Sequence, residues 1–369
     1  MADNTLAEKI DALIAKKIPF AFYYSPGEED PTLVIQTEGP LFRAESYEDL
    51  NGIEGFVFAP FDIRPHTPLV VIRSDRLLKG ISVITACNTD DMSSPEFSTK
   101  EEKRFPPPEM SKTEYRQLAA PLIRMIQDGE FEKVVLSRTL CVDMPEGRSC
   151  GEMLLKLKEK VNDAFICLVH LPGIGTWMGA TPELLLRKRN DRFHTVSLAG
   201  TLPVGDSNGV FNWTAKEIRE QEIVTEFIET QLKTFGIDGY EKSGPFTSFA
   251  ANVAHLKTEI GFPCEKVETE LGRFISTLHP TSAVCGNSRE KARGYILAKE
   301  RHDREYYCGF LGEWNLAGRL NLYVNIRCMK ILGNKACLYV GGGITADSIV
   351  DSEWDETNHK AKTLLSILM

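Results

Sequence analysis

A hairpin-like segment near the C-terminus constrains the fold of this chain more than any other feature of its sequence. Residues 322–331 and 336–340 read as strands, and they flank the pair Gly333-Asn334, which is typical of a tight turn between antiparallel strands. Because side chains alternate between the two faces of a strand, Arg327 points away from the apolar face formed by its neighbours. We therefore predict an antiparallel hairpin with Arg327 either in solvent or in a polar cleft.

Helical and strand-like segments follow one another along the rest of the chain. Ser111 and Glu114 fit a capping box, and the helix that they begin contains Pro121, which should kink it. Gly129 ends this helix, and an apolar strand that begins at Lys133 follows. The mixture predicts an α/β fold, and the alternating strands favour antiparallel sheets.

The first hundred residues read as a mixed α/β portion of the fold, with a helix at the start and strands at 56–61 and 69–72. Residues 88–108 are polar and end in three prolines, which is typical of an exposed connection. We place a boundary there, so that residues 1–108 form the N-terminal α/β portion and residues 109–369 form the catalytic core. An alternative is that the two portions are intertwined in one domain.

Charge and hydropathy narrow the class of partner. The net charge of −9 and the lack of a basic run argue against nucleic acid or an anionic membrane as the main partner. No stretch approaches the roughly 20 apolar residues of a membrane span, and the charged N-terminal residues lack the apolar run of a signal peptide. We therefore expect a cytoplasmic protein that acts on a small molecule.

The nine cysteines give little support for a soft-metal site. Their number is odd and they contain no Cys-x-x-Cys pair, so we expect neither a disulfide framework nor a zinc site. Most should be buried as small apolar residues. His279 and Cys285 could suggest a cysteine–histidine protease, but nothing else in the sequence supports one, and packing explains both residues better.

Three glutamates form a candidate metal site. Glu220 precedes apolar residues of its helix by three, four, seven and eight positions, which places it on the inward stripe; a partly exposed carboxylate favoured by the helix dipole explains it equally well. Glu353 and Glu356 lie three residues apart at a helix start, where like charges repel unless a cation lies between them. Oxygen ligands without nearby His or Cys favour Mg²⁺, although a solvated acidic helix start also explains such a pair.

Lys133 and Glu183 form a candidate acid/base pair. Lys133 opens an apolar strand and Glu183 ends the run GATPE, and ionisable groups rarely occupy such positions without a reason. His255 is polar enough to bind an anion or a hydroxyl, but such a histidine is more often a buried packing residue. The run Gly341-Gly342-Gly343 could bring backbone N–H groups close to a carboxylate or phosphate, or simply form a tight turn.

Ten short runs, in their order along the chain, resemble those of chorismate-utilising enzymes. This family includes isochorismate, salicylate, anthranilate and aminodeoxychorismate synthases. The resemblance covers the chain from Ser111 to the C-terminus, and it implies large, mainly antiparallel sheets flanked by helices, with the active site in a cleft between them. The matching runs are KVVLSR, GATPE, SLAGT, KEIREQ, AHLKTE, LHPTSAVCG, DREYYCG, NIRCMK, GGGIT and EWDET.

The resemblance also implies binding roles, residue by residue. Glu220 and Glu356 match positions that bind Mg²⁺, and Glu353 matches an auxiliary ligand; the metal would hold the ring carboxylate of chorismate. The remaining matches are to substrate-binding positions. Arg327 and Tyr307 match residues that bind the enolpyruvyl carboxylate, with help from the backbone of Gly341, Gly342 and Gly343, and His255 and Thr201 match residues near the ring.

Lys133 is the position that separates the branches of this family. Members that use water carry lysine here, whereas members that use ammonia tend to carry glutamine. Lys133 would activate water for attack at C2 of chorismate, which requires surroundings that favour its neutral form. Glu183, held protonated, would donate a proton to the departing C4 hydroxyl. The resemblance thus implies an isochorismate synthase, an isomerase.

Neighbouring functions in the same family stay open. The run from His279 to Gly286 lacks the nucleophilic lysine of aminodeoxychorismate synthases, and we expect no glutaminase subunit. This run and the compact length look more like isochorismate synthases of the siderophore (2,3-dihydroxybenzoate) branch than like salicylate synthases, which go on to eliminate pyruvate. A menaquinone-pathway isochorismate synthase and a non-catalytic chorismate-binding protein also fit the sequence. The resemblance also leads us to expect a monomer.

Overall fold

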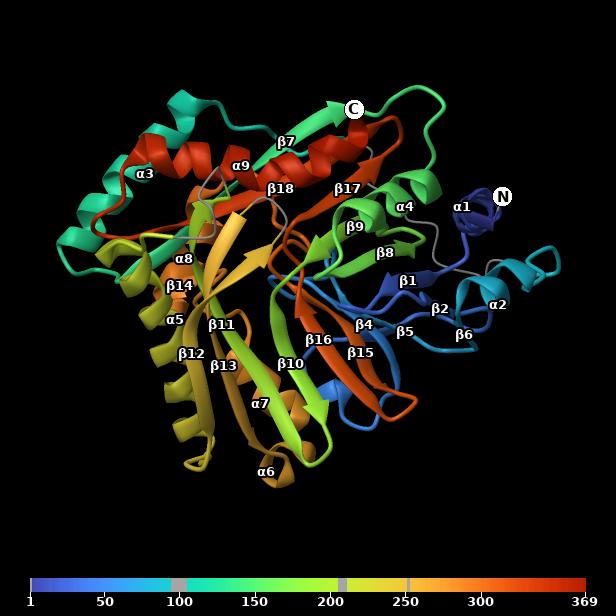
Figure 1. Cartoon of the computed structure of the whole chain (residues 1–369), viewed down its shortest axis with the longest axis horizontal. Coiled ribbons are helices and arrows are strands. Elements are labelled where there is room, and N and C mark those ends of the chain that lie inside the picture. Colours follow the sequence, from blue (N-terminus) through green and yellow to red (C-terminus); the bar gives the residue numbers. More distant parts are fainter. Residues whose placement is uncertain (1, 94–104, 205–210, 251–252) are drawn as a thin grey trace.

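The strands of the chain form two large antiparallel sheets. The computed structural model describes residues 2–93, 105–204, 211–250 and 253–369, and within these ranges each sheet has nine strands (Figure 1). In spatial order, sheet I consists of β14 (Gly286–Asn287), β7 (Lys133–Asp143), β18 (Lys335–Ile344), β17 (Cys328–Leu332), β9 (Gly175–Thr181), β8 (Phe165–Leu171), β1 (Phe20–Tyr24), β2 (Thr32–Ile35) and β6 (Arg76–Lys79). Sheet II consists of β12 (Glu241–Ala250), β13 (Val253–Pro263), β11 (Arg192–Pro203), β10 (Leu184–Arg189), β16 (Arg319–Val324), β15 (Phe310–Leu316), β4 (Gly55–Ala59), β5 (Leu69–Ile72) and β3 (Phe42–Ala44).

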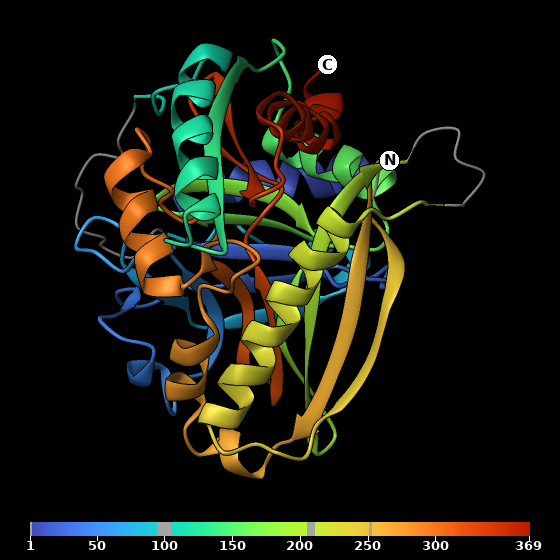
Figure 2. The same ribbon diagram turned by 90° about the vertical axis from the view of Figure 1, so that its left-hand side faces the viewer.

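Helices pack against both sheets. Figure 2 shows α5 lying along the strands β11 to β13 of sheet II, and α9 packs on β18 of sheet I. No helix within the described ranges is long and apolar enough to cross a bilayer. The helices are α1 (Ala2–Ala15), η1 (Glu48–Leu50), α2 (Ile81–Ala86), α3 (Lys112–Gln127), α4 (Cys150–Lys160), α5 (Ala215–Thr234), α6 (Glu265–Glu268), α7 (Leu271–Leu278), α8 (Arg289–Lys299) and α9 (Val350–Leu368).

The core consists of two apolar layers, one on each face of sheet I. In β1, Phe20 and Phe22 join the layer under α1, α4 and α9, whereas Ala21 and Tyr23 join the layer between the two sheets. Side chains that alternate along a strand reach both layers. Because both faces are covered, β1 is apolar throughout and buried at every position. The α/β fold with large antiparallel sheets and flanking helices is therefore confirmed.

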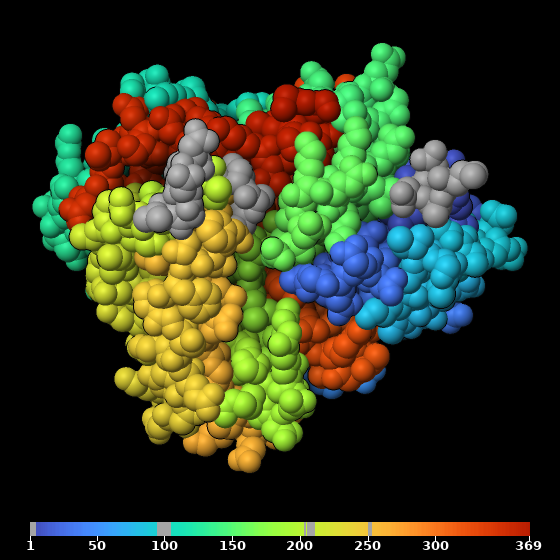
Figure 3. Space-filling model, viewed as in Figure 1, coloured from blue at the N-terminus to red at the C-terminus, as the bar shows by residue number. Residues whose placement is uncertain are grey.

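Strands from the N-terminal part of the chain occur in both sheets. In sheet I, β1 pairs with β8, and in sheet II, β4 pairs with β15. Figure 3 shows the N-terminal residues, in blue, packed directly against the green middle part of the chain. The division into residues 1–108 and 109–369 stays a prediction, and much of the predicted connection at 88–108 lies outside the described residues.

The predicted hairpin is confirmed, but its first strand is not continuous. β17 and β18 pair from Leu332 and Lys335 outward, on either side of the Gly333-Asn334 turn. The predicted strand 322–331 is wrong in its middle, because β16 belongs to sheet II and β17 to sheet I. The chain crosses between the sheets at Asn325–Arg327, where Arg327 has a φ of 50°. Arg327 does point into a polar cavity, as predicted. Its direction follows from the crossing between the sheets and not from alternation along a single strand.

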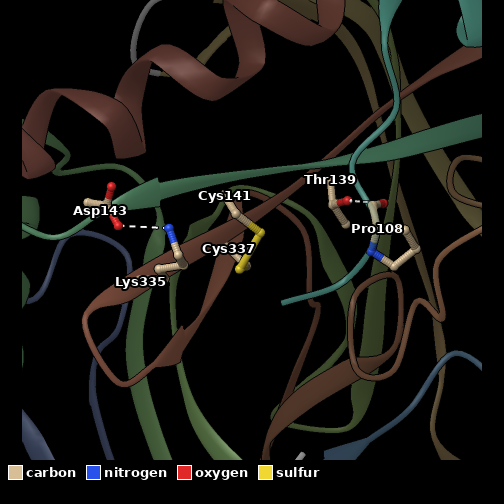
Figure 4. Close-up of a disulfide and its surroundings, with 6 residues drawn as sticks. All are labelled: Pro108, Thr139, Cys141, Asp143, Lys335 and Cys337. Atoms are coloured by element: carbon tan, nitrogen blue, oxygen red, sulfur yellow. Dashed lines mark hydrogen bonds and ion pairs between the residues drawn. A yellow bond between two sulfur atoms is a disulfide. The ribbon is translucent and has the colours of Figure 1, made fainter. Parts of the chain in front are cut away.

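One disulfide joins two of the nine cysteines, for which the sequence analysis expected no disulfide framework. Cys141 of β7 and Cys337 of β18 are directly paired in the strand register and are joined by a disulfide, with their Cα atoms 4.1 Å apart (Figure 4). The two residues lie 196 positions apart in the chain, so only the pairing of the strands brings them together. Among the described residues, most of the other cysteines are buried.

Local helix signals are reproduced closely. Ser111 and Glu114 form the predicted capping box at the start of α3, and Pro121 lies inside that helix. The predicted strand 69–72 coincides with β5, and Lys133 is the first residue of β7. These signals depend on neighbouring residues, which explains why they can be read without the tertiary structure.

A buried ion pair stabilises the region behind β7. The Glu300 carboxylate accepts hydrogen bonds from Arg304 Nε and Nη2 at 2.7 Å each and from the backbone N–H of Ser137 at 2.7 Å. Arg304 also donates to the carbonyls of Val284 and Val135. Both side chains of the pair are 2% exposed. Removing either charge would therefore leave the other buried without a partner, which strongly destabilises the folded state.

We predict that Glu300→Gln destabilises the protein by about 3–5 kcal/mol, because it leaves the buried Arg304 guanidinium without a counter-charge. Urea unfolding followed by circular dichroism measures this effect. The matched control is Arg301→Gln, which removes an exposed ion pair with Glu114 and should leave the midpoint unchanged. Equal unfolding midpoints for the two variants would show that the buried pair contributes no more to stability than the exposed pair does.

Candidate active site

A polar cavity lies where the two sheets meet α5 and α9. Side chains and backbone from β11, β13, β18, α5 and the crossings between the sheets line it, and they leave about 60 Å³ of free space. This is less than the roughly 300 Å³ of a typical ligand pocket, so a substrate must displace side-chain contacts as it enters. The predicted residues that line it are Glu183, Thr201, Glu220, His255, Tyr307, Arg327, Gly341, Gly342 and Gly343.

Two chain crossings between the sheets place Glu183 and Arg327. One crossing connects β9 to β10 and carries Glu183, and the other connects β16 to β17 and carries Arg327. Each crossing is bonded to the strand that leads into the other, since Ala180 N–H near the end of β9 donates to the Arg327 carbonyl at 3.1 Å and Val324 N–H at the end of β16 donates to the Glu183 carbonyl at 2.9 Å. These bonds continue the β9–β17 and β10–β16 pairings into the crossings, and they fix the backbone of both residues at the cavity.

The same junction places Tyr307. It precedes β15, and the N–H of the next residue, Cys308, donates to the carbonyl of Asn325 in the second crossing. The Tyr307 ring stacks on Tyr339 with centroids 5.5 Å apart. Burial raises the pKa of Tyr307 well above its usual value, so its hydroxyl keeps its proton and can donate it in a hydrogen bond.

Lys133 and Glu220 form a buried ion pair beside the cavity. Lys133 Nζ lies 3.0 Å from Glu220 Oε1, and the lysine side chain is 1% exposed. The pair needs a glycine next to it, because a Cβ atom at Gly343 would lie 2.4 Å from Glu220 Oε1 and 2.6 Å from Lys133 Cε. The inward placement of Glu220 predicted from helix periodicity is confirmed.

Glu353 and Glu356 are also paired with lysines. Glu353 Oε1 lies 2.7 Å from Lys216 Nζ, and Glu356 Oε1 lies 2.6 Å from Lys360 Nζ. Gly342 lies under both carboxylates, since a Cβ atom there would be 3.4 Å from Glu356 Oε1 and 3.5 Å from Glu353 Oε2. The three predicted metal-binding glutamates thus surround one stretch of β18.

Lys216 and Lys360 are functional candidates that the sequence analysis missed. Lys216 precedes Glu220 by four residues in α5, and Lys360 follows Glu356 by four residues in α9. Residues at this spacing share a helix face, so the signal was present. The charges of Lys133, Lys216 and Lys360 outweigh the effect of burial and hold the pKa of Glu220 below its usual value.

The glutamates offer oxygen ligands but are not gathered as a ready metal site. In the part of the chain that the structure describes, no group of three or more His, Cys, Asp or Glu side chains is arranged to hold a metal ion. However, the buried Glu353 Oε2 has no hydrogen-bond partner, and burial together with the Glu356 charge raises the pKa of Glu353 to about 7. A carboxylate oxygen that lacks a partner beside a second carboxylate fits a hard cation.

Glu183 has the properties of a proton donor. Burial raises the pKa of Glu183 to about 7, although the positive charges of Lys133, Lys360 and Arg327 act in the opposite direction. A carboxyl group with such a pKa is largely protonated at slightly acidic pH and can exchange its proton near neutrality. A proton donor needs this property, and the donor role of Glu183 stays a prediction.

His255 orients Arg327. A bulge in β11 at Gly200 interrupts the register with β13, and the Gly200 carbonyl lies 3.0 Å from His255 Nδ1. Burial and the Arg327 charge lower the pKa of His255 to about 3, so the ring is neutral. With Nδ1 donating to Gly200, Nε2 accepts from Arg327 Nη2 at 3.3 Å. Thr201 Oγ1 lies 3.3 Å from the same Nδ1.

The cavity therefore combines a cationic end and an acid/base end. Arg327 and the Tyr307 hydroxyl can bind a carboxylate, while Glu183 and Lys133 can exchange protons. The lysine–glutamate pairs are buried charges. A small anionic ligand, alone or together with a cation, could replace one partner of such a pair. This arrangement is suited to proton transfer on a small, multiply charged anion.

Comparison with known proteins agrees with this geometry. The chain is 29% identical over 261 residues to the vibriobactin-specific isochorismate synthase of Vibrio cholerae, covering 69% of this chain and 66% of the relative. It is 30% identical over 262 residues to the isochorismate synthase EntC of Escherichia coli, covering 69% of this chain and 67% of the relative.

A solved structure shows the same fold over the whole chain. The crystal structure of DhbC from Bacillus anthracis superposes with a TM-score of 0.78 at 24% sequence identity, covering 98% of this chain and 99% of that one. The family model described as chorismate binding enzyme matches residues 72–369, a range that includes every strand and helix around the cavity. The protein therefore belongs to the family of chorismate-binding enzymes.

Proposed function

We propose that the protein is an isochorismate synthase, which converts chorismate to isochorismate. The observation that carries this proposal is the presence of a buried lysine, Lys133, in the same cavity region as a glutamate, Glu183, whose pKa is raised to about 7. A base and a proton donor are what water addition at C2 and loss of the C4 hydroxyl require. The similarity to the vibriobactin-specific enzyme of Vibrio cholerae supports the same reaction, in siderophore formation.

Binding of chorismate relies on its two carboxylates. Arg327, held by His255, and the protonated Tyr307 hydroxyl bind the enolpyruvyl carboxylate. Glu220, Glu356 and Glu353 would hold Mg²⁺, which would bind the ring carboxylate and neutralise its charge. The backbone at Gly341 to Gly343 allows the substrate to approach closely.

The chemical step needs two proton transfers, one at C2 and one at the C4 hydroxyl. Lys133 accepts a proton from the attacking water, which it can do only in its neutral form, so its ion pair with Glu220 must be broken first. Glu183 then protonates the leaving hydroxyl at C4 as the double bonds shift. Salicylate synthase is the second candidate, because the same pair of residues could go on to eliminate pyruvate.

The products decide between these functions. Purified protein with chorismate and Mg²⁺ at neutral pH is expected to yield isochorismate without pyruvate, and EDTA is expected to stop the reaction, as resolved by chromatography. Salicylate together with pyruvate would instead identify the second candidate. Chorismate that binds but stays unchanged would mean a non-catalytic binding protein.

We predict that Lys133→Ala lowers kcat by about 10²–10⁴-fold, because it removes the general base, and leaves chorismate binding within a few-fold. Turnover assays and calorimetric titration measure the two quantities. The matched control is Lys188→Ala, which removes a partly exposed lysine of β10 that pairs with Glu268 of α6 and should leave kcat unchanged. Full activity of Lys133→Ala would disprove the assignment of the base.

The pH dependence of kcat/KM should follow the protonation of Glu183. Its carboxyl group must be protonated to act as the donor, so kcat/KM is expected to fall as the pH rises through about 7. Glu183→Gln should be inactive at every pH, since the amide cannot donate a proton to the leaving hydroxyl. A wild-type kcat/KM that stays level from about pH 6 to about pH 9 would contradict the role of Glu183.

A further inference from the structure

A second cavity, of about 350 Å³, lies on the opposite side of the segment that follows α7. Its lining shares no residue with that of the catalytic cavity. His279 and Pro280, at the start of this segment, face the second cavity, whereas Ala283 and Val284, at its end, face the first. The volume is in the range of a small-molecule pocket.

A buried histidine forms part of the wall of this cavity. His279 is 3% exposed, and neither ring nitrogen has a partner with hydrogen-bond geometry, although the backbone of Pro60 is close enough to interact with the ring. Burial lowers the pKa of His279 to about 3, so the ring is neutral, with one N–H donor and one acceptor. Both ring nitrogens are also shielded from the cavity, so His279 contributes a flat, neutral surface to its wall rather than an open hydrogen-bonding group.

Aromatic and apolar groups form the walls around His279. The Tyr47 ring meets the histidine edge-on, with centroids 5.9 Å apart and an angle of 87°. Phe61 and Ile63 line the same space. Phe61 is held in place from behind, because the Arg304 guanidinium lies 4.6 Å from its ring centroid. These walls suit a flat, apolar body rather than a strongly hydrated one.

Two arginines supply positive charge at one end of the cavity. Arg289 and Arg293 lie one turn apart at the start of α8, where the helix dipole also favours an anion. Arg289 is fixed by its hydrogen bond to the Thr277 carbonyl at 2.6 Å. Arg293 pairs with Asp62, which is shared with Arg64, and Arg289 pairs with Glu290, whose side chain is 79% exposed. The charges that line the cavity therefore balance, but an exposed ion pair contributes little, so a ligand carboxylate can replace Glu290 beside Arg289.

The balance of charges selects the kind of anion. Asp62 lies among the arginines, and the exposed Glu290 pairs with Arg289 at 3.2 Å. These carboxylates would repel a multiply charged group such as a phosphate more strongly than a single negative charge. A carboxylate, by contrast, matches the planar fork of a guanidinium, and its apolar body can lie against the aromatic walls.

We propose that this second cavity binds a small aromatic carboxylate. The carboxylate lies between Arg289 and Arg293, and the aromatic ring packs against Tyr47, Phe61, Ile63 and the neutral ring of His279. The proposal does not depend on the reaction catalysed in the first cavity, because the two cavities have separate linings.

Methyl signals can show which cavity a ligand occupies. Ile63 lines the second cavity and Ile326 lines the catalytic one, so a protein labelled at isoleucine methyl groups carries a reporter in each. The two signals are assigned with Ile63→Leu and Ile326→Leu variants. Benzoate is the probe, and benzamide, which has the same shape without the charge, is its matched control.

Titration with benzoate is expected to shift the Ile63 signal in a saturable manner, and benzamide is expected to bind at least about tenfold more weakly, because it lacks the charge-assisted contact. Arg293→Gln should weaken benzoate binding by about tenfold or more. Arg301→Gln, which removes a charge at the surface, should leave the affinity unchanged. Arg293 is substituted rather than Arg289, because Arg289 also donates a hydrogen bond to the end of α7 and its loss could disturb the fold.

Three results would overturn the proposal. One is an Ile63 signal that stays in place up to about 10 mM benzoate, well above the affinity expected of a charged fragment. Another is a benzoate titration that moves only the Ile326 signal, which would place the ligand in the catalytic cavity. The third is equal binding of benzoate and benzamide that Arg293→Gln does not weaken, which would mean that the cavity is merely apolar.

Discussion

The hydrogen bonds that anchor two chain crossings hold the candidate active site of this fold together. Where β9 passes to β10 and β16 passes to β17, the chain leaves one sheet for the other. The carbonyls of Glu183 and Arg327, which lie in these crossings, accept hydrogen bonds from the ends of β16 and β9, respectively. The constraint that buried backbone groups need partners therefore places a carboxyl group with a raised pKa and a guanidinium within one cavity.

The cavity between the sheets holds more charge than an ordinary protein core. Lys133, Lys216 and Lys360 each lie against one of the glutamates that surround β18, and burial would make any of these charges costly alone. In each pair the lysine and the glutamate neutralise one another, which removes this cost. A substrate that brings its own negative charges can exchange partners with them, which is the balance that a site for a small anion needs.

Local patterns in the sequence were read reliably, whereas long-range pairings were not. The capping box at Ser111, the turn at Gly333-Asn334 and the inward face of Glu220 each depend on residues within a few positions of one another. The break in the predicted strand 322–331 and the disulfide between Cys141 and Cys337 depend on which strands become neighbours. Alternation and spacing carry no information about that choice.

The sequence by itself determined the family motifs and the α/β class, and it predicted which residues act as acid, base and carboxylate ligands. Only the tertiary structure decided that Lys133 lies 3.0 Å from Glu220, that Lys216 and Lys360 belong to the same group of charges, and that His279 faces a separate cavity. The reason is physical. Residue type and periodicity fix which way a side chain points within its own element, but distances between charges, and the pKa values that follow from burial, arise only when distant elements pack together.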